Sequence, residues 1–234
     1  MNIDANEISQ VTAAQAPRVD MYAGIHKAIR AMMADTLLAM GRMDSSDELE
    51  VAQTTQRVLE LLDFCASHLK HENEFVHSAI EARAPGASER IAHEHEEHEA
   101  HIATLSQSVA ALRATTAESR AAVAQNLYRS LSLFVAENFQ HMYVEETAHN
   151  AVLWARYTDA ELMEIHSRLV ASIPPAEMMV VARWMLPFMN PVERLAVLSD
   201  MQGHAPPPAF QAVLDTVRPH LTGREWEKLA QALL

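Results

Sequence analysis

The 234-residue sequence is poor in two residue types whose absence excludes whole classes of protein. It contains a single cysteine, Cys65, which excludes a disulfide framework and any metal site built from thiolates alone. It contains only 5 glycines, too few for a set of nucleotide-binding loops or for a turn-rich β fold. We therefore expect a protein of a reduced, cytoplasmic compartment, built mainly from helices.

Basic residues and long apolar runs are also scarce. The formal net charge is −13, which disfavours nucleic acid or an anionic membrane as a partner. No apolar run is long enough to cross a bilayer, and the N-terminus lacks the basic-then-apolar pattern of a signal peptide. Apolar residues nevertheless make up 49% of the chain, which is sufficient for a folded core. We expect a globular protein with neither nucleic acid nor a membrane as a partner.

Four long segments carry apolar residues at spacings of three and four, which predicts amphipathic helices. Gly41 is expected to end the first of them, and Pro85-Gly86 the second. No segment shows the alternation typical of a strand. The sequence predicts an all-α fold, with the four helices forming an antiparallel up-down four-helix bundle. The helices are expected at about Val19 to Met40, Asp47 to Arg83, Ser88 to Leu112 and Ala117 to Arg156.

The two ends of the chain differ from this central part. Residues 1–17 are polar and are expected to form a flexible N-terminal tail. After residue 157 the pattern changes to short helices, whose starts are marked by possible caps at Thr158, Asn190 and Thr222. We therefore divide the chain into a tail (1–17), a four-helix bundle (18–157) and a C-terminal helical extension (158–234).

Ionisable side chains occupy positions on the apolar stripes of all four long helices. A histidine and a glutamate four residues apart point the same way on a helix. The pair His68 and Glu72, and the pair His141 and Glu145, can therefore each act as a bidentate metal ligand. Burying these groups would be costly unless metal cations compensate them. The candidate metal ligands are His26, His68, Glu72, His95, His98, His141 and Glu145.

An internal repeat supports a paired site. The same 73 positions separate His68 from His141 and Glu72 from Glu145. Each helical hairpin therefore supplies one histidine from its first helix, His26 or His95, and one His-x-x-x-Glu pair from its second. Two such halves facing one another predict a pseudo-symmetric centre with two metal ions.

These residues resemble the hemerythrin family in its HHE cation-binding form, over roughly residues 18–157. The motifs that carry the resemblance are His26, His68-Leu69-Lys70-His71-Glu72, His95 and His141-Met142-Tyr143-Val144-Glu145. The resemblance implies that the four histidines are terminal ligands and that Glu72 and Glu145 bridge two non-haem iron ions, together with an oxo or hydroxo group. It also favours iron over manganese or zinc.

The sequence departs from the oxygen-carrying hemerythrins in its third and fourth helices. Those proteins carry His-x-x-x-His on the third helix, whereas Ile91, Glu94 and Glu99 stand where a second histidine would complete the pair. Their last motif has an aspartate five residues after its histidine, whereas Glu145 follows His141 by four. The chain is more similar to the bacterial iron-repair, NO-responsive and iron-sensing relatives. His98 can be a fifth imidazole ligand or a hydrogen-bond donor that orients Glu72 or Glu145.

The remaining histidines are interpreted as structural or solvent-exposed. His93 and His101 lie off the stripe of the third helix, and His71, His77 and His149 are expected on faces away from the site. Tyr22, one turn before His26, is expected in the core, with a phenol hydrogen bond near bound dioxygen as the alternative. Cys65 is expected to be a small buried hydrophobic residue.

The expected function is a non-haem di-iron protein that binds or reacts with dioxygen, nitric oxide or peroxide, in sensing, detoxification or a redox role. Its partners would be the diatomic gas or peroxide and an electron donor that the sequence does not identify. One alternative is a di-iron oxidase or oxygenase acting on an organic substrate reached past Trp184 or Phe188. Another is iron storage or repair. The sequence leaves open both the oligomeric state and whether the protein is an enzyme, although a di-iron oxidoreductase is compatible with it.

Overall fold

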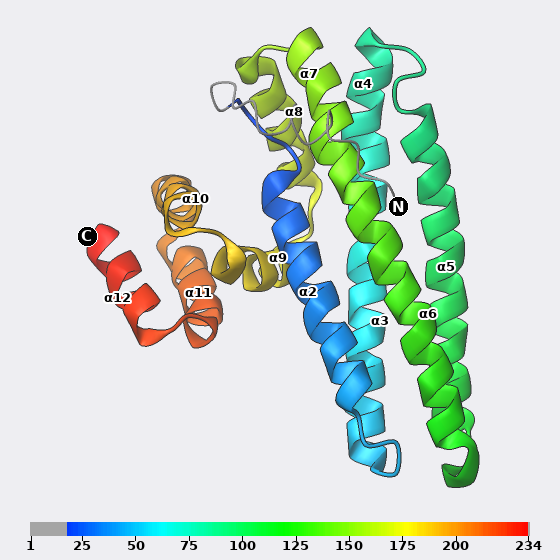
Figure 1. The fold of residues 1–234 in the computed structure, drawn as a ribbon. Helices are drawn as coiled ribbons and strands as arrows, with labels where there is room; N and C mark the ends of the chain where they lie inside the picture. The colour runs from blue at the N-terminus through cyan, green and yellow to red at the C-terminus, as the bar shows by residue number, and fades with distance from the viewer. Residues whose placement is uncertain (1–17, 234) are drawn as a thin grey trace, which may run out of the picture.

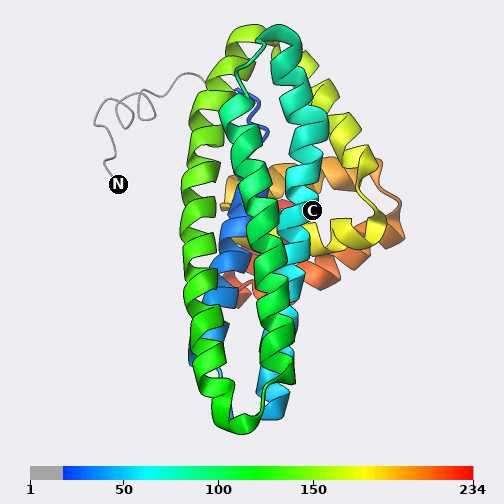
Figure 2. The same cartoon turned by 90° about the vertical axis from the view of Figure 1, so that its right-hand side faces the viewer.

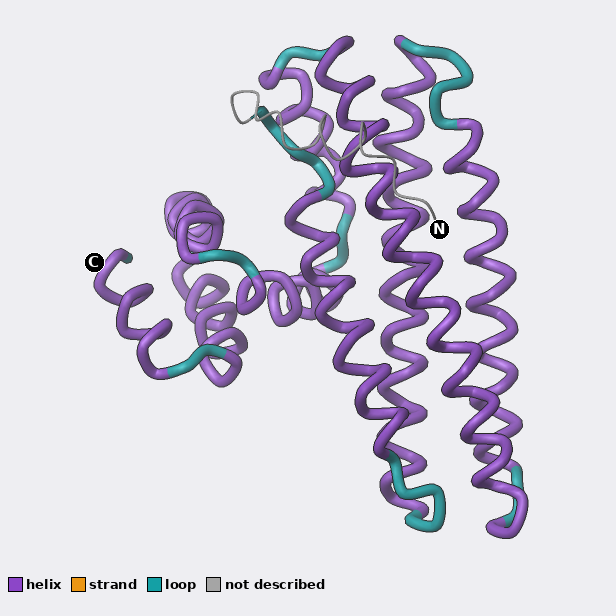
Figure 3. The backbone as a smooth tube through the Cα atoms, in the orientation of Figure 1, coloured by secondary structure: helices purple, strands orange, loops and turns teal. Residues whose placement is uncertain are grey.

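The computed structural model describes residues 18–233, and every regular element among them is a helix (Figure 3). The predicted all-α fold is therefore confirmed. The predicted N-terminal tail, residues 1–17, lies outside the described residues.

Four long helical rods lie side by side, and consecutive rods run in opposite directions (Figures 1 and 2). Helix α2 packs against α3 and α6, and helix α5 also packs against α3 and α6. The first rod is α2 (Ala23–Arg42), and the third is α5 (Glu89–Ala114). The second rod joins α3 (Glu48–His71), the π-helix η1 (Glu72–His77) and α4 (Ser78–Arg83). The fourth joins α6 (Ala117–Val144), the π-helix η2 (Glu145–His149) and α7 (Asn150–Arg156).

Local sequence explains most ends of these rods. The side chain of Asp47 accepts hydrogen bonds from the backbone amides of Leu49 and Glu50 at 2.8 and 3.2 Å, which caps the second rod. Gly86 adopts a positive φ of 82° in the turn after the second rod, a conformation that glycine tolerates best. The prediction that Gly41 ends the first helix is wrong, because α2 continues to Arg42. A Cβ atom at Gly41 would lie 3.1 Å from the ring of Tyr128, so glycine instead permits close packing of α2 on α6.

The apolar core of the rods is divided into two clusters. On the second rod, the larger cluster includes Leu61 and Cys65, and the smaller one begins at Val76. On the fourth rod, the larger cluster reaches Met142 and the smaller one includes Leu153. The buried histidines and glutamates of these rods therefore lie between two apolar layers.

The C-terminal residues form short helices beside the first rod (Figure 1). Each of the three predicted caps is confirmed as a capping box, at Thr158, Asn190 and Thr222. Helix α9 packs against α2 and contributes Val181 to the larger core cluster. The elements are α8 (Asp159–Ser172), α9 (Pro175–Met185), η3 (Leu186–Phe188), α10 (Pro191–His204), α11 (Pro207–Val217), η4 (Arg218–His220) and α12 (Gly223–Ala232).

Within residues 18–233, no single helix combines the length and apolar character needed to cross a membrane. The segments Asp159–Ser172 and Pro175–Phe188 meet those two criteria only when taken together, and they are bent by 118° at the break between them.

Candidate metal centre

Six of the seven candidate ligands converge from all four rods. His68 is half-buried, and the other five are almost fully buried. Their ligand atoms form two groups, within each of which every atom lies within 4.8 Å of the others. Both groups include Glu72 and Glu145; the first adds His26 and His68, and the second adds His95 and His141. Each hairpin of the predicted repeat thus contributes one imidazole pair.

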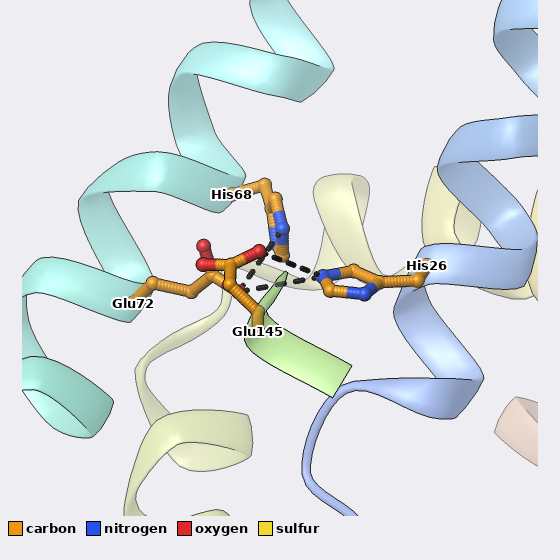
Figure 4. A group of neighbouring side chains, drawn as sticks. All are labelled: His26, His68, Glu72 and Glu145. Carbon is orange, nitrogen blue, oxygen red and sulfur yellow. Dashed lines mark ion pairs between the residues drawn. The ribbon is translucent and has the colours of Figure 1, made fainter. Parts of the chain in front are cut away.

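Each carboxylate faces both imidazole pairs. The Nε2 atom of His26 lies 3.5 Å from Glu72 Oε1 and 3.5 Å from Glu145 Oε2 (Figure 4). The Nε2 atom of His95 lies 3.6 Å from the other oxygen of each carboxylate. His68 Nε2 is 3.2 Å from Glu72 Oε1, and His141 Nε2 is 3.5 Å from Glu145 Oε1. Each carboxylate therefore lies between the two imidazole pairs.

The chemistry of the buried atoms fits cations. Among the described residues, nothing donates a hydrogen bond to any of the four oxygens of Glu72 and Glu145, and Nε2 of His26 and of His68 forms no hydrogen bond. Burying polar atoms without partners costs free energy, whereas a divalent cation would satisfy carboxylate oxygens and imidazole nitrogens together. These six residues therefore form a site that can hold metal ions.

The outward ring nitrogens of three histidines have fixed partners. His26 Nδ1 donates to Glu146 Oε1 at 3.0 Å, since a carboxylate can only accept. His141 Nδ1 donates to Glu94 Oε2 at 2.9 Å in the same way. His95 Nδ1 donates to the side-chain oxygen of Asn73 at 2.8 Å. In each neutral ring the proton is therefore on Nδ1, and the lone pair of Nε2 points into the cluster, as metal binding requires.

Arginines support the two carboxylate partners. Arg30 donates to both oxygens of Glu146, at 2.5 and 3.0 Å, and Arg90 donates to Glu94 at 3.0 Å. Asn73 and Glu146 occupy equivalent positions in the 73-residue repeat. Each comes directly after a glutamate that both groups share, Glu72 or Glu145. Helical spacing within one segment does not reveal these partners, although the 73-residue repeat was a usable signal for Asn73 and Glu146.

Without metal, the buried glutamates and histidines of this cluster shift one another's pKa values. Burial raises the pKa of Glu72 most, and the charge of Glu145 raises it further, to about 8. Glu145 is also buried, but the neighbouring His141 and His95 hold its pKa well below the usual value. Burial lowers the pKa of His26, yet the interactions with Glu146 and Glu72 outweigh it and bring the pKa to about 9. In the absence of metal, protons therefore take the place of cations on Glu72 and His26 at neutral pH.

Two further histidines lie beside the cluster, and the interpretation that placed them on other faces is wrong for both. His77 and His149 are 5% and 2% exposed, and with Glu145 they form a third group of potential ligand atoms. His149 follows Glu145 by four residues, so regular helical spacing could have identified it. His77 follows Glu72 by five, and the wider turn of the π-helix η1 brings it to the inner face. Burial lowers the pKa of both, that of His77 to about 3.

Tyr22 is buried in the smaller apolar cluster, as the sequence predicts, and its hydroxyl also reaches the centre. Its oxygen lies 3.2 Å from Nδ1 of His149, at hydrogen-bonding distance. Its ring packs against His26, with 5.3 Å between the ring centroids. The predicted core position of Tyr22 is therefore confirmed, and its hydroxyl contacts His149.

His98 lies outside the two groups of ligand atoms, next to the ring of His141. Its ring packs edge-on against His141, with 4.6 Å between centroids, and against Phe134 at 6.1 Å. Burial, followed by the neighbouring His141 and His95, lowers the pKa of His98 to about 4. It belongs to neither four-residue group, and its ring contacts are with His141 and Phe134.

The other histidines of the predicted bundle face outwards or make local contacts. His93 is exposed, with 70% of its side chain accessible, and His101 interacts with Glu137 at 3.1 Å near the surface. His71 is half-buried beside α9, with its Nδ1 atom 4.0 Å from Glu177. Cys65 is buried, as expected, and burial raises the pKa of its thiol to about 12.

Fold and cluster together define a helical protein with a site suited to metal ions. The family model of the hemerythrin HHE cation binding domain matches residues 18–153. This match covers more than half of the chain, so the protein belongs to the hemerythrin HHE family, as the resemblance in its motifs indicates. No curated protein and no solved structure matches the chain.

Proposed function

We propose that this is a hemerythrin-like non-haem di-iron protein that binds or reacts with dioxygen, nitric oxide or peroxide, with electrons from an external donor. In this proposal the four rods act as an antiparallel up-down four-helix bundle around the metals. One observation carries it: Glu72 and Glu145 are each shared between two imidazole pairs, His26 with His68 and His95 with His141. Mixed carboxylate and imidazole ligands suit iron, which is the metal that members of this family typically bind.

Protein groups would fix the position and the basicity of the ligands. Bound iron would supply the electrons and the open coordination positions for the small molecule. His26 and His141 would bind through Nε2 while donating from Nδ1 to Glu146 and Glu94, which orients both rings and makes them stronger donors. The apolar layers on either side of the cluster would limit access of water.

Nothing among the described residues specifically favours the other two functions considered. For an oxidase acting on an organic substrate, a cavity lined by cluster residues would be expected. A described cleft of about 930 Å³ is instead lined by residues such as Val51, Arg57 and Arg113, at the opposite end of the second rod. Trp184 and Phe188 stack on each other, with 6.0 Å between their centroids.

The test begins with protein stripped of metal and reloaded with Fe(II) without air. We expect two tightly held iron ions per chain, and an absorbance change when O₂, NO or hydrogen peroxide is added. Because both imidazole pairs depend on Glu72, Glu72→Gln should lose most of the bound iron. Exposed His93→Ala should keep it.

The reaction with O₂ also separates the proposal from simple oxygen carriage. We expect the reduced protein to become oxidised and to stay so under argon. An absorbance change that reverses under argon would identify an oxygen carrier. Retention of one iron or fewer after loading, or no response to any of the three molecules, would contradict the proposed function.

A further inference from the structure

A second pair of buried imidazoles adjoins the proposed di-iron centre. His77 belongs to η1 and His149 to η2, in the segments that begin with Glu72 and Glu145. Their rings are nearly perpendicular, at 82°, with 5.3 Å between the centroids. His77 also stacks on His95, with 4.7 Å between centroids. The pair therefore lies directly against the ligand groups, and the roles proposed above do not use it.

Three polar atoms of this region have no hydrogen-bond partner within the described part of the chain. They are His77 Nε2, His149 Nε2 and the side-chain oxygen of Asn150, all in residues that are at most 5% exposed. The amide nitrogen of Asn150 is already used, since it donates to the backbone oxygen of Glu146 at 3.1 Å. Leaving a buried polar atom unpaired costs free energy, so three such atoms together indicate a missing partner.

We propose that His77, His149 and Glu145 hold a third divalent cation beside the pair. One ligand atom from each of the three residues lies within 4.8 Å of the other two. Two imidazoles and one carboxylate are a ligand set that first-row divalent metals accept, and it leaves coordination positions open for solvent. The proposal rests on the paired centre described above, because Glu145 is common to both.

The orientation of the two rings favours a cation at their Nε2 atoms. His149 Nδ1 lies 3.2 Å from the hydroxyl of Tyr22, which leaves Nε2 as its free nitrogen. The stacking on His95 positions the ring of His77 against the same cluster. A shared carboxylate and repulsion from two neighbouring cations make this third position weaker than the paired ones. We therefore expect it to fill last and to exchange fastest.

The experiment is an anaerobic titration of metal-free, full-length protein with Zn(II), followed by calorimetry and by elemental analysis after desalting. The wild type should take up two tight equivalents and a third, weaker one. The double variant His77→Gln/His149→Gln should take up the two tight equivalents only. A control with the same number of histidines removed, His93→Gln/His204→Gln, changes two exposed residues and should retain all three equivalents.

A milder variant tests the same site without changing a proposed ligand. Tyr22→Phe removes only the hydroxyl that contacts His149, and it should weaken the third equivalent by about 10-fold while leaving the other two. This variant keeps the test decisive if circular dichroism shows that the double variant is unfolded. Unchanged uptake of the third equivalent by Tyr22→Phe and by a folded double variant would overturn the inference.

The remaining outcomes distinguish this inference from the proposed function. A wild type that binds only two equivalents contradicts the third position and leaves the paired centre intact. A wild type that binds fewer than two contradicts the paired centre as well. Loss of a tight equivalent in the folded double variant would show that His77 and His149 serve the pair, which also overturns a separate third position.

Discussion

The ring nitrogens that face away from the candidate metal centre differ in what they contact. His26 and His141 donate to the carboxylates of Glu146 and Glu94, whereas His95 donates to the amide oxygen of Asn73. A carboxylate accepts a stronger hydrogen bond from the ring than an amide oxygen does. This makes the opposite ring nitrogen more basic and therefore a stronger metal ligand. Each four-residue group therefore contains one imidazole supported by a carboxylate.

Replacement of one of these carboxylates tests its effect on metal binding. Glu146→Gln keeps the size of the side chain but removes the charge that faces His26 and Arg30. We expect metal affinity to fall by about 10- to 100-fold, measured by competition with a chelator of known affinity.

The matched control for this variant is Glu137→Gln. Glu137 contacts His101 at 3.1 Å near the surface and is not part of the cluster. Its replacement should leave metal affinity unchanged. Equal losses in the two variants would mean that general electrostatics, not the contact with His26, controls the affinity.

The two π-helices are the elements that most affect the site. Each begins at one of the shared glutamates, and each interrupts a rod that is otherwise α-helical. A π turn contains an extra residue and rotates the following side chains relative to an α-helix. In η1 this rotation brings His77 inwards, which explains why regular α-helical spacing assigned it to another face.

Helix α9 is one of the C-terminal helices that pack against the rods. Its Val181 is 7% exposed and belongs to the larger core cluster, whereas the neighbouring Val180 is 41% exposed. The contact with α2 therefore depends on one face of α9, and a charge on that face should disrupt it.

This packing gives a direct prediction for stability. Val181→Asp would bury a carboxylate in the apolar cluster and should lower the free energy of unfolding by about 3 kcal/mol or more, measured by urea denaturation. Val180→Asp places the same group at the surface and should change it by less than about 0.5 kcal/mol. If both variants lose the same stability, α9 does not pack through Val181 in solution.

In the molecule as a whole, the core combines apolar layers with a layer of ionisable groups. Cations at the centre would compensate the two carboxylates, and without them protons must do so. Since metal binds the folded chain far better than the unfolded one, occupancy should add to the free energy of unfolding.

The pH dependence of stability should therefore differ between metal-free and loaded protein. Folding raises the pKa of Glu72 from 4.5 to about 8 and that of His26 from 6.5 to about 9. Raised values stabilise the folded state at low pH, and that contribution is lost as pH rises through the folded-state pKa. Metal-free protein should therefore lose on the order of 1.4 kcal/mol per pH unit through Glu72 between about pH 4.5 and 8, and through His26 between about pH 6.5 and 9.

Urea denaturation at several pH values, with and without metal, provides the measurement. The loaded protein should be more stable at neutral pH and should not follow this decline, because bound metal replaces both protons. Parallel pH profiles for the two forms would show that Glu72 and His26 do not lie in the metal site.

The sequence by itself determined the helices and the six residues that converge. Helical periodicity and capping are local properties, and His68 with Glu72 or His141 with Glu145 share a face through spacing alone. The same rule, applied to Glu145, would have found His149. His98 lies beside the ring of His141, outside both groups of ligand atoms. Its position on the apolar face of the third long helix did not predict this.

Only the tertiary structure decided which groups surround those six residues. Glu146 reaches His26 across 120 positions of sequence, and Glu94 reaches His141 across 47. The inward turn of His77 depends on a π-helix, a backbone geometry that local propensity does not specify. These features arise because packing four rods together fixes contacts between distant segments, and no spacing within a single helix encodes them.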